Sequence, residues 1–152
     1  MNTQERDVCF GERRLGRDYS GLMSFGMFLI IVGIVFVVNR NFISDFELWI
    51  KQVTEEQVLT RPPESLITSA MIFFGLIGLS DFFKAGIRLW IDKSRRRVLG
   101  DILSGIALVL FAYLISLYAI YALTWQQVLA IEAIAVGLLV ILYSMVRYMF
   151  LK

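Results

Sequence analysis

The stretch ILSGIALVLFAYLISLYAIYALTWQQVLAI, residues 102–131, carries no charged side chain. A helix of about 20 residues crosses the roughly 30 Å hydrocarbon core of a membrane, so this stretch is too long for a single crossing. A polar cluster with an aromatic interface residue interrupts it at Thr124, Trp125, Gln126 and Gln127. We therefore predict a tight turn at this cluster, which joins membrane helices at residues 102–123 and 128–148.

Two other stretches have the same apolar character. Residues 19–39 carry no charge and are long enough to cross a bilayer. Residues 66–83 follow Pro62 and Pro63, which suit the first turn of a helix because the amide hydrogen that they lack would be unpaired there. We expect this helix to extend on the cytoplasmic side to about residue 93. With 58% hydrophobic and 18% charged residues, the chain is more apolar than a soluble domain, in which about 25% of residues are charged.

These observations predict an all-α polytopic membrane protein, a four-helix bundle of two hairpins. Residues 19–152 would form one domain after a basic tail, residues 1–18. Twelve of the 15 lysines and arginines lie in this tail, between the second and third spans, or at the C-terminal end. The outer loop, residues 40–64, holds only Arg40, Lys51 and Arg61. By the positive-inside rule we expect both termini in the cytoplasm, and a prokaryotic plasma membrane as the location.

The outer loop carries an amphipathic helical stripe. Its apolar residues recur at helical spacing and include Phe42, Phe46, Trp49, Ile50 and Val53. Two capping boxes, Ser44 with Glu47 and Thr54 with Gln57, predict two short helices. One interpretation is an interfacial helix that lies on the outer leaflet or folds over the bundle. The alternative makes the same five apolar residues a docking surface for another subunit, or a lid over a cavity.

The cytoplasmic extension of the second span combines acidic and basic residues on one helical face. Asp81 and Lys84 have the spacing of an ion pair within a helix. Long cationic side chains at this depth can reach anionic lipid headgroups. We expect such contacts from Lys84, Arg88, Lys93, Arg95, Arg96 and Arg97. Because the positive-inside pattern accounts for these charges, we expect no nucleic-acid partner.

Few polar groups lie within the spans. The candidate intramembrane polar site consists of Glu132, Asp81, Tyr113 and Ser116. An acid in a span is a candidate for ion or proton handling, whereas the shallow depth of Glu132 favours a structural role. In that role we expect Glu132 to reach water or to form hydrogen bonds with Thr124, Tyr121 or Thr68.

Acidic and small residues mark helix ends and packing faces. Asp18 and Asp101 precede the first and third spans, where a carboxylate favours the positive end of a helix, so we predict that they cap these helices. Small residues permit close approach of membrane helices. We expect helix packing at Gly26, Gly33, Gly75, Gly78, Ala133 and Gly137.

The composition limits which metal sites and catalytic groups the chain can form. The chain contains no histidine and one cysteine, Cys9, which excludes His-ligated haem, His-containing metal sites, Cys-His nucleophiles and disulfides within the chain. We therefore expect no enzymatic activity and no cofactor. The small-residue faces and the aromatic loop favour a protein that acts by helix association, as an accessory subunit or a homo-oligomeric scaffold. The alternative is an oligomeric channel or transporter for a small cation or solute, with Glu132 at its outer mouth.

Overall fold

The computed structural model describes residues 3–56, 61–91 and 95–150, which form five helices and no strand. The helices are α1 (Thr3–Val38), α2 (Phe42–Glu56), α3 (Glu64–Ile91), α4 (Arg95–Ala119) and α5 (Trp125–Phe150). All except α2 contain a segment long and apolar enough to cross a membrane. These segments are Gly21–Val38, Glu64–Trp90, Val98–Ala119 and Trp125–Val146. The all-α class is confirmed, and the four apolar helices are consistent with an integral membrane protein.

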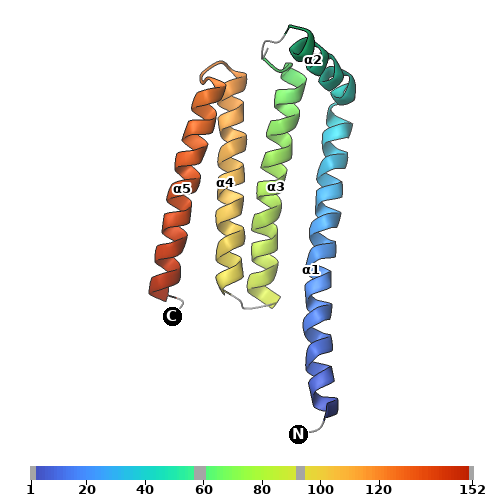
Figure 1. Cartoon of the computed structure of the whole chain (residues 1–152), viewed down its shortest axis with the longest axis vertical. Helices are drawn as coiled ribbons and strands as arrows, with labels where there is room; N and C mark the ends of the chain where they lie inside the picture. Colours follow the sequence, from blue (N-terminus) through green and yellow to red (C-terminus); the bar gives the residue numbers. More distant parts are fainter. Residues whose placement is uncertain (1–2, 57–60, 92–94, 151–152) are drawn as a thin grey trace.

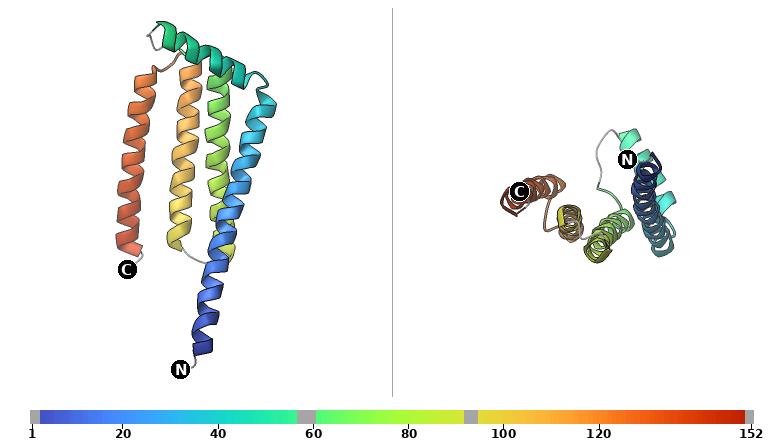
Figure 2. Two further views of the ribbon diagram at one scale, coloured as in Figure 1. Left: turned by 45° about the vertical axis from the view of Figure 1, so that its right-hand side comes forward. Right: turned by 90° about the horizontal axis from the view of Figure 1, so that it is seen from below.

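The four long helices stand side by side in an open row, in the order α1, α3, α4, α5 (Figures 1 and 2). We expected a four-helix bundle of two hairpins, and the structure shows an open row instead. Lipid tails solvate an apolar helix face as well as a neighbouring helix does, so nothing forces the ends of the row to close. Only 11% of the span in α1 and 6% of the span in α5 is buried, against 28% in each of the two central helices.

The tightest part of the row is the crossing of α3 and α4. A Cβ atom added to Gly78 would lie 2.8 Å from Val109 Cγ2 and 3.0 Å from the carbonyl oxygen of Gly105. The backbones therefore meet with no room for a side chain. Gly75 lies at the same crossing, where an added Cβ would be 3.7 Å from the Cβ of Ala112. Pairing is thus closest between α3 and α4, which the two-hairpin scheme placed in different hairpins.

Helix α2 is a single helix that lies near the end of α1 and the start of α3 and projects to one side of the row (Figures 1 and 2). Ser44 and Thr54 are inside it, and their hydroxyls donate to the carbonyl oxygens of Asn41 and Ile50, at 2.9 and 2.8 Å. Neither residue therefore acts as the cap that the two-helix prediction required, while Gln57 falls outside the described residues. No glycine or proline interrupts residues 42–56, so the helix continues unbroken.

Two other predicted helix starts are also displaced. Helix α1 begins at Thr3 and helix α4 at Arg95, so Asp18 and Asp101 lie inside the helices that they were expected to cap. The residues before each aspartate are mostly good helix formers such as arginine and leucine, which extend both helices beyond the apolar segment. The predicted tail, residues 1–18, is therefore helical from Thr3 onward.

The turn between α4 and α5 covers residues 120–124, so it lies slightly before the predicted position. Thr124 is the one residue of the polar cluster in this turn, and Trp125, Gln126 and Gln127 form the start of α5. Two residues after the end of α4, Tyr121 adopts the left-handed conformation, with φ of 60°. The amide of Ala122 donates to the carbonyl of Leu117 at 3.0 Å, a helix-ending pattern that satisfies a carbonyl left free by the last turn. Gln127 then accepts a hydrogen bond from the amide of Thr124 at 2.8 Å, which caps the start of α5.

Candidate functional site

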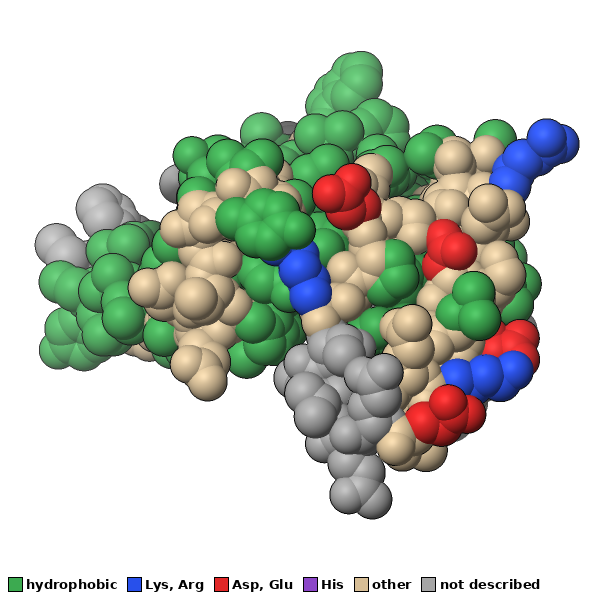
Figure 3. Space-filling view, turned by 90° about the horizontal axis from the view of Figure 1, so that it is seen from above, with side chains coloured by type: hydrophobic (Ala, Val, Ile, Leu, Met, Phe, Trp, Pro, Cys, Tyr) green, Lys and Arg blue, Asp and Glu red, His purple; other side chains and the backbone are tan. Residues whose placement is uncertain are grey.

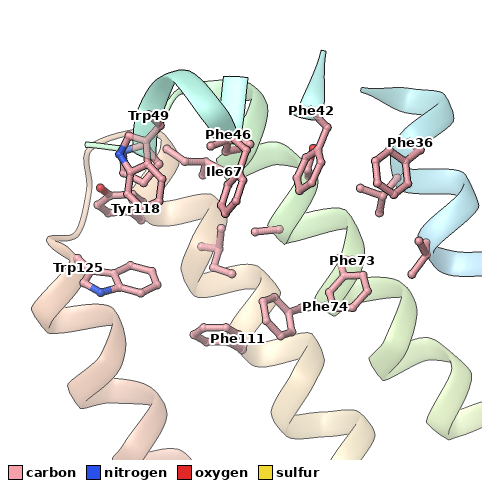
Figure 4. A pocket seen from close by; sticks show the side chains of 17 residues that line it. Phe36, Phe42, Phe46, Trp49, Ile67, Phe73, Phe74, Phe111, Tyr118 and Trp125 are labelled. Atoms are coloured by element: carbon pink, nitrogen blue, oxygen red, sulfur yellow. The ribbon is translucent and has the colours of Figure 1, made fainter. Parts of the chain in front are cut away.

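An apolar cavity of about 660 Å³ lies beneath α2 on one face of the row (Figure 4). All five helices line it: α2 covers one end, and the long helices form the walls. Phe42, Phe46 and Trp49 of α2 contribute the roof. Ile50 and Val53, the other two residues of the predicted amphipathic stripe, do not line the cavity. Helix α2 therefore folds over the other helices, a position that both sequence interpretations allowed, either as a helix folded over the bundle or as a lid over a cavity.

A polar network holds α2 in place over the cavity. The side-chain amide of Asn39, just after α1, donates to the carbonyl of Ser65 at 3.0 Å and to the hydroxyl of Ser69 at 2.9 Å. The hydroxyl of Ser65 donates in turn to the carboxylate of Asp45 on α2, at 2.5 Å. These contacts join the end of α1 and the first turn of α2 to the start of α3. The sequence analysis did not identify this network.

Phenylalanines from α3 and α4 form the deep end of the cavity. The rings of Phe73 and Phe74 meet edge to face at 5.5 Å, and those of Phe74 and Phe111 at 4.8 Å. Edge-to-face geometry is a favoured arrangement of aromatic rings and adds to the packing energy of the pair. At the other end, Tyr118 and Trp125 meet at 5.7 Å, below Trp49 (Figure 4).

The surface that lines the cavity is almost entirely hydrocarbon. Among the described residues, no charged residue lines the cavity, and the polar side chains of the lining are those of Ser69, Tyr118, Trp49 and Trp125. The Ser69 hydroxyl is already engaged, since it donates to Ser65 and accepts from Asn39. An apolar pocket with few polar groups is the common form of a small-molecule site, and this one is suited to an uncharged, apolar ligand.

Arg61 lies at the edge of the cavity and was not singled out from the sequence. Its Nη2 atom donates to the carbonyls of Tyr118 and Ala119, at 3.0 and 2.8 Å, so the cation caps the negative end of α4. The guanidinium carbon lies 3.4 Å from the ring centre of Tyr121 and 4.8 Å from that of Tyr118. No carboxylate of the described residues forms an ion pair with it. Acidic and basic side chains are scattered over this end of the molecule (Figure 3).

A second polar cluster joins the last turns of α3 to the first turns of α4, at the helix ends farthest from α2. Asp81 accepts from Lys84 at 3.0 Å and from the hydroxyl of Ser104 at 2.8 Å. Arg88 binds both carboxylate oxygens of Asp101, at 2.8 and 2.6 Å. Lys84 and Arg88, expected to contact lipid headgroups, are therefore engaged in ion pairs, because both carboxylates lie within reach on the same helix or the next. Lys93 and the side chains of Arg95, Arg96 and Arg97 lie outside what the structure describes.

The four members of the predicted intramembrane polar site do not converge. Asp81 lies in the cluster just described, while Glu132 is in the second turn of α5, near the opposite end of the row. Tyr113 is 59% exposed, and the Ser116 hydroxyl donates to the Tyr113 carbonyl within α4 at 2.6 Å. Oε2 of Glu132 is buried and has no hydrogen-bond partner among the described residues. The expected bonds to Thr124, Tyr121 or Thr68 are therefore not made by this oxygen.

The small residues divide into two groups. Gly75 and Gly78 lie at the α3–α4 crossing, together with Gly105, which the sequence analysis did not select. A Cβ atom added at Gly26, Gly33 or Gly137 would meet nothing within 4 Å, and Ala133 is exposed. The first group packs helices within the chain. The second group lies on α1 and α5, the two ends of the row, where no other helix of this chain covers it.

Comparison of the chain with protein-family models, with curated proteins and with solved structures gives no match in any of the three. The described residues contain no group of three or more acidic, cysteine or histidine side chains that could hold a metal ion.

Proposed function

We propose that this protein acts by lateral association in the membrane, as an accessory subunit of a larger complex or as a homo-oligomer, and that it carries out no catalysis. The observation that carries this proposal is the open row. Its end helices, α1 and α5, present small residues to the exterior, and an added Cβ at Gly33 or Gly137 would meet nothing. Small residues allow helix backbones to approach closely, which is the main source of packing energy between helices in lipid.

The low burial of the end helices supports the same conclusion. The exposed side chains on α1 and α5 are large and apolar, and include Leu22, Val37, Ile134 and Leu138 at 56–79% exposure. Lipid or another helix can cover such surfaces equally well, so apolar character alone does not favour a partner. The glycines on the same helices do favour one, because a glycine offers a lipid tail no advantage but offers a helix a closer approach.

Native mass measurement after extraction in a mild detergent tests the proposal. We expect a species heavier than the 17.4 kDa chain, either a multiple of this mass or a complex with another protein. Replacement of Gly33 by Leu should reduce the assembly. Gly86→Leu is the matched control, because Gly86 also has open space around an added Cβ but lies on α3. A wild-type protein that is monomeric and carries no other protein would overturn the proposal.

A second candidate function rests on Glu132. We retain the hypothesis of an oligomeric conduit for a small cation or solute, because an acid with a buried, unpaired oxygen inside a span is costly unless it has a role. Flux of monovalent cations into liposomes that contain the protein should fall or lose its cation preference in Glu132→Gln. Unchanged flux in that variant, or none from the wild type, would remove this candidate.

The proposal includes an orientation. With both termini in the cytoplasm, α2 and the cavity lie on the outer side of a plasma membrane, and the clusters around Asp81 and Arg88 lie on the inner side. The distribution of cations in the sequence is the support for this orientation.

A further inference from the structure

The cavity beneath α2 is open to the region that lipid tails occupy. Its walls are the halves of α1, α3 and α4 nearest to α2, and these belong to segments that are apolar enough to span a membrane. The cavity is partly open, and the described end helices of the row, α1 and α5, lie apart from each other (Figure 2). A space of about 660 Å³ with this lining does not stay empty in a bilayer, because an unfilled void forfeits the dispersion contacts of its walls.

The shape of the cavity favours a flexible chain over a helix. A helix with its side chains is about 10 Å wide. A helix that ran parallel to the long helices would meet α2, which lies over one end of the cavity (Figure 4). A hydrocarbon chain can enter from the side and bend beneath Phe46 and Trp49. The volume of about 660 Å³ falls within the roughly 300–1,000 Å³ of pockets that hold one small ligand.

Arg61 indicates which class of molecule would bring such a chain. It lies against Tyr118, a residue of the cavity lining, and no carboxylate of the described residues balances its charge. A guanidinium group is well suited to binding phosphate. We propose that the cavity holds one acyl chain of a phospholipid from the leaflet on the α2 side, with the phosphate of that lipid beside Arg61. This site is independent of the association surfaces on α1 and α5.

Native mass spectrometry of the detergent-purified protein tests this proposal, with phosphatidylglycerol and diacylglycerol of the same chains as probes. We expect one phosphatidylglycerol to remain bound per chain, and diacylglycerol to bind more weakly. Ala70 lines the cavity, so Ala70→Phe should lower lipid retention by at least about tenfold by filling the space. Thr68→Phe is the matched control, since Thr68 is exposed on the same helix outside the cavity and should leave retention unchanged.

A photo-crosslinking experiment on the wild type keeps the test independent of how Ala70→Phe folds. Phosphatidylglycerol with a diazirine in mid-chain should label peptides that contain Phe73, Phe111 or Trp125. Label spread evenly over the exposed faces of α1 and α5 would overturn the proposal, as would equal retention in Ala70→Phe and Thr68→Phe. If the cavity peptides escaped labelling only in oligomers, a second copy of the chain would fill the cavity in place of the lipid, and this result would also overturn the proposal. The same mass spectra report the oligomeric state, so failure of the lipid site is distinguishable from failure of lateral association.

Discussion

The closest helix contact in the chain can be tested by adding one methyl group. In Gly78→Ala the new Cβ would lie 2.8 Å from Val109 Cγ2 and 3.0 Å from both the Gly105 carbonyl oxygen and the Val109 amide nitrogen. The valine side chain could shift, but the two backbone atoms move only if α3 and α4 separate. We therefore expect the variant to be less stable than the wild type, although alanine is the better helix former.

The magnitude follows from two opposing contributions. Forcing an extra methyl group into a packed contact costs about 1–3 kcal/mol. Replacing glycine by alanine inside a helix gains up to about 1 kcal/mol. The free energy of unfolding of Gly78→Ala should therefore fall by up to about 2 kcal/mol. The same change at Gly75, where the added Cβ lies 3.7 Å from Ala112, should be neutral or stabilising because 3.7 Å is an ordinary contact distance.

Reversible unfolding in mixed micelles of a mild detergent and dodecyl sulfate, followed by far-UV circular dichroism, measures this difference. Gly86→Ala is the matched control, because the added Cβ would meet nothing on the same helix and only the helix-propensity gain remains. If Gly78→Ala were as stable as Gly86→Ala, the α3–α4 crossing would not be as close as described, and the argument from backbone contact would fail.

Three other results are expected. Asn39→Ala should lower the free energy of unfolding by about 1–2 kcal/mol and speed amide hydrogen exchange in α2, because two hydrogen bonds to α3 are lost; unchanged exchange in α2 would contradict the network. Arg88→Met and Asp101→Asn should each destabilise the chain by about 1–2 kcal/mol, between the values for exposed and buried ion pairs. The double variant should lose less stability than the two single variants added together, and strict additivity would mean that the pair is not coupled. In a cysteine-free background, a membrane-impermeant thiol reagent on intact cells should label a cysteine at Gln126 and spare one at Ser94; the reverse pattern would invert the orientation.

The number and places of the apolar helices could be predicted from the sequence because hydropathy is a local property. An uncharged stretch of about 20 residues is readable in the chain itself, and so is a polar interruption such as Thr124 to Gln127. The helix ends were less predictable. Polar and basic residues beyond the apolar segment continue α1 and α4 as helix, so Asp18 and Asp101 are not caps. The amphipathic character of α2 was also readable, since its apolar residues share one face.

The candidate site was only partly predictable. The roof residues Phe42, Phe46 and Trp49 were identified, because an aromatic stripe on an otherwise polar loop is a distinct signal. The walls were not, since phenylalanines such as Phe74 and Phe111 do not stand out in spans that are apolar throughout. Arg61 was counted only as one of the few outer cations, and no local pattern indicates that it caps a helix 57 residues further along the chain.

The sequence by itself determined that the chain is helical, that four helices are long and apolar enough to cross a membrane, and that a turn lies close to Thr124. Only the tertiary structure decided that these helices form an open row, that α3 and α4 meet at Gly78 and Gly105, and that α2 roofs a cavity. The physical reason is the solvent. In water an apolar stripe shows which face a helix buries, whereas a helix suited to lipid is apolar on every side, so its neighbours are chosen by shape and by a few polar contacts between distant residues.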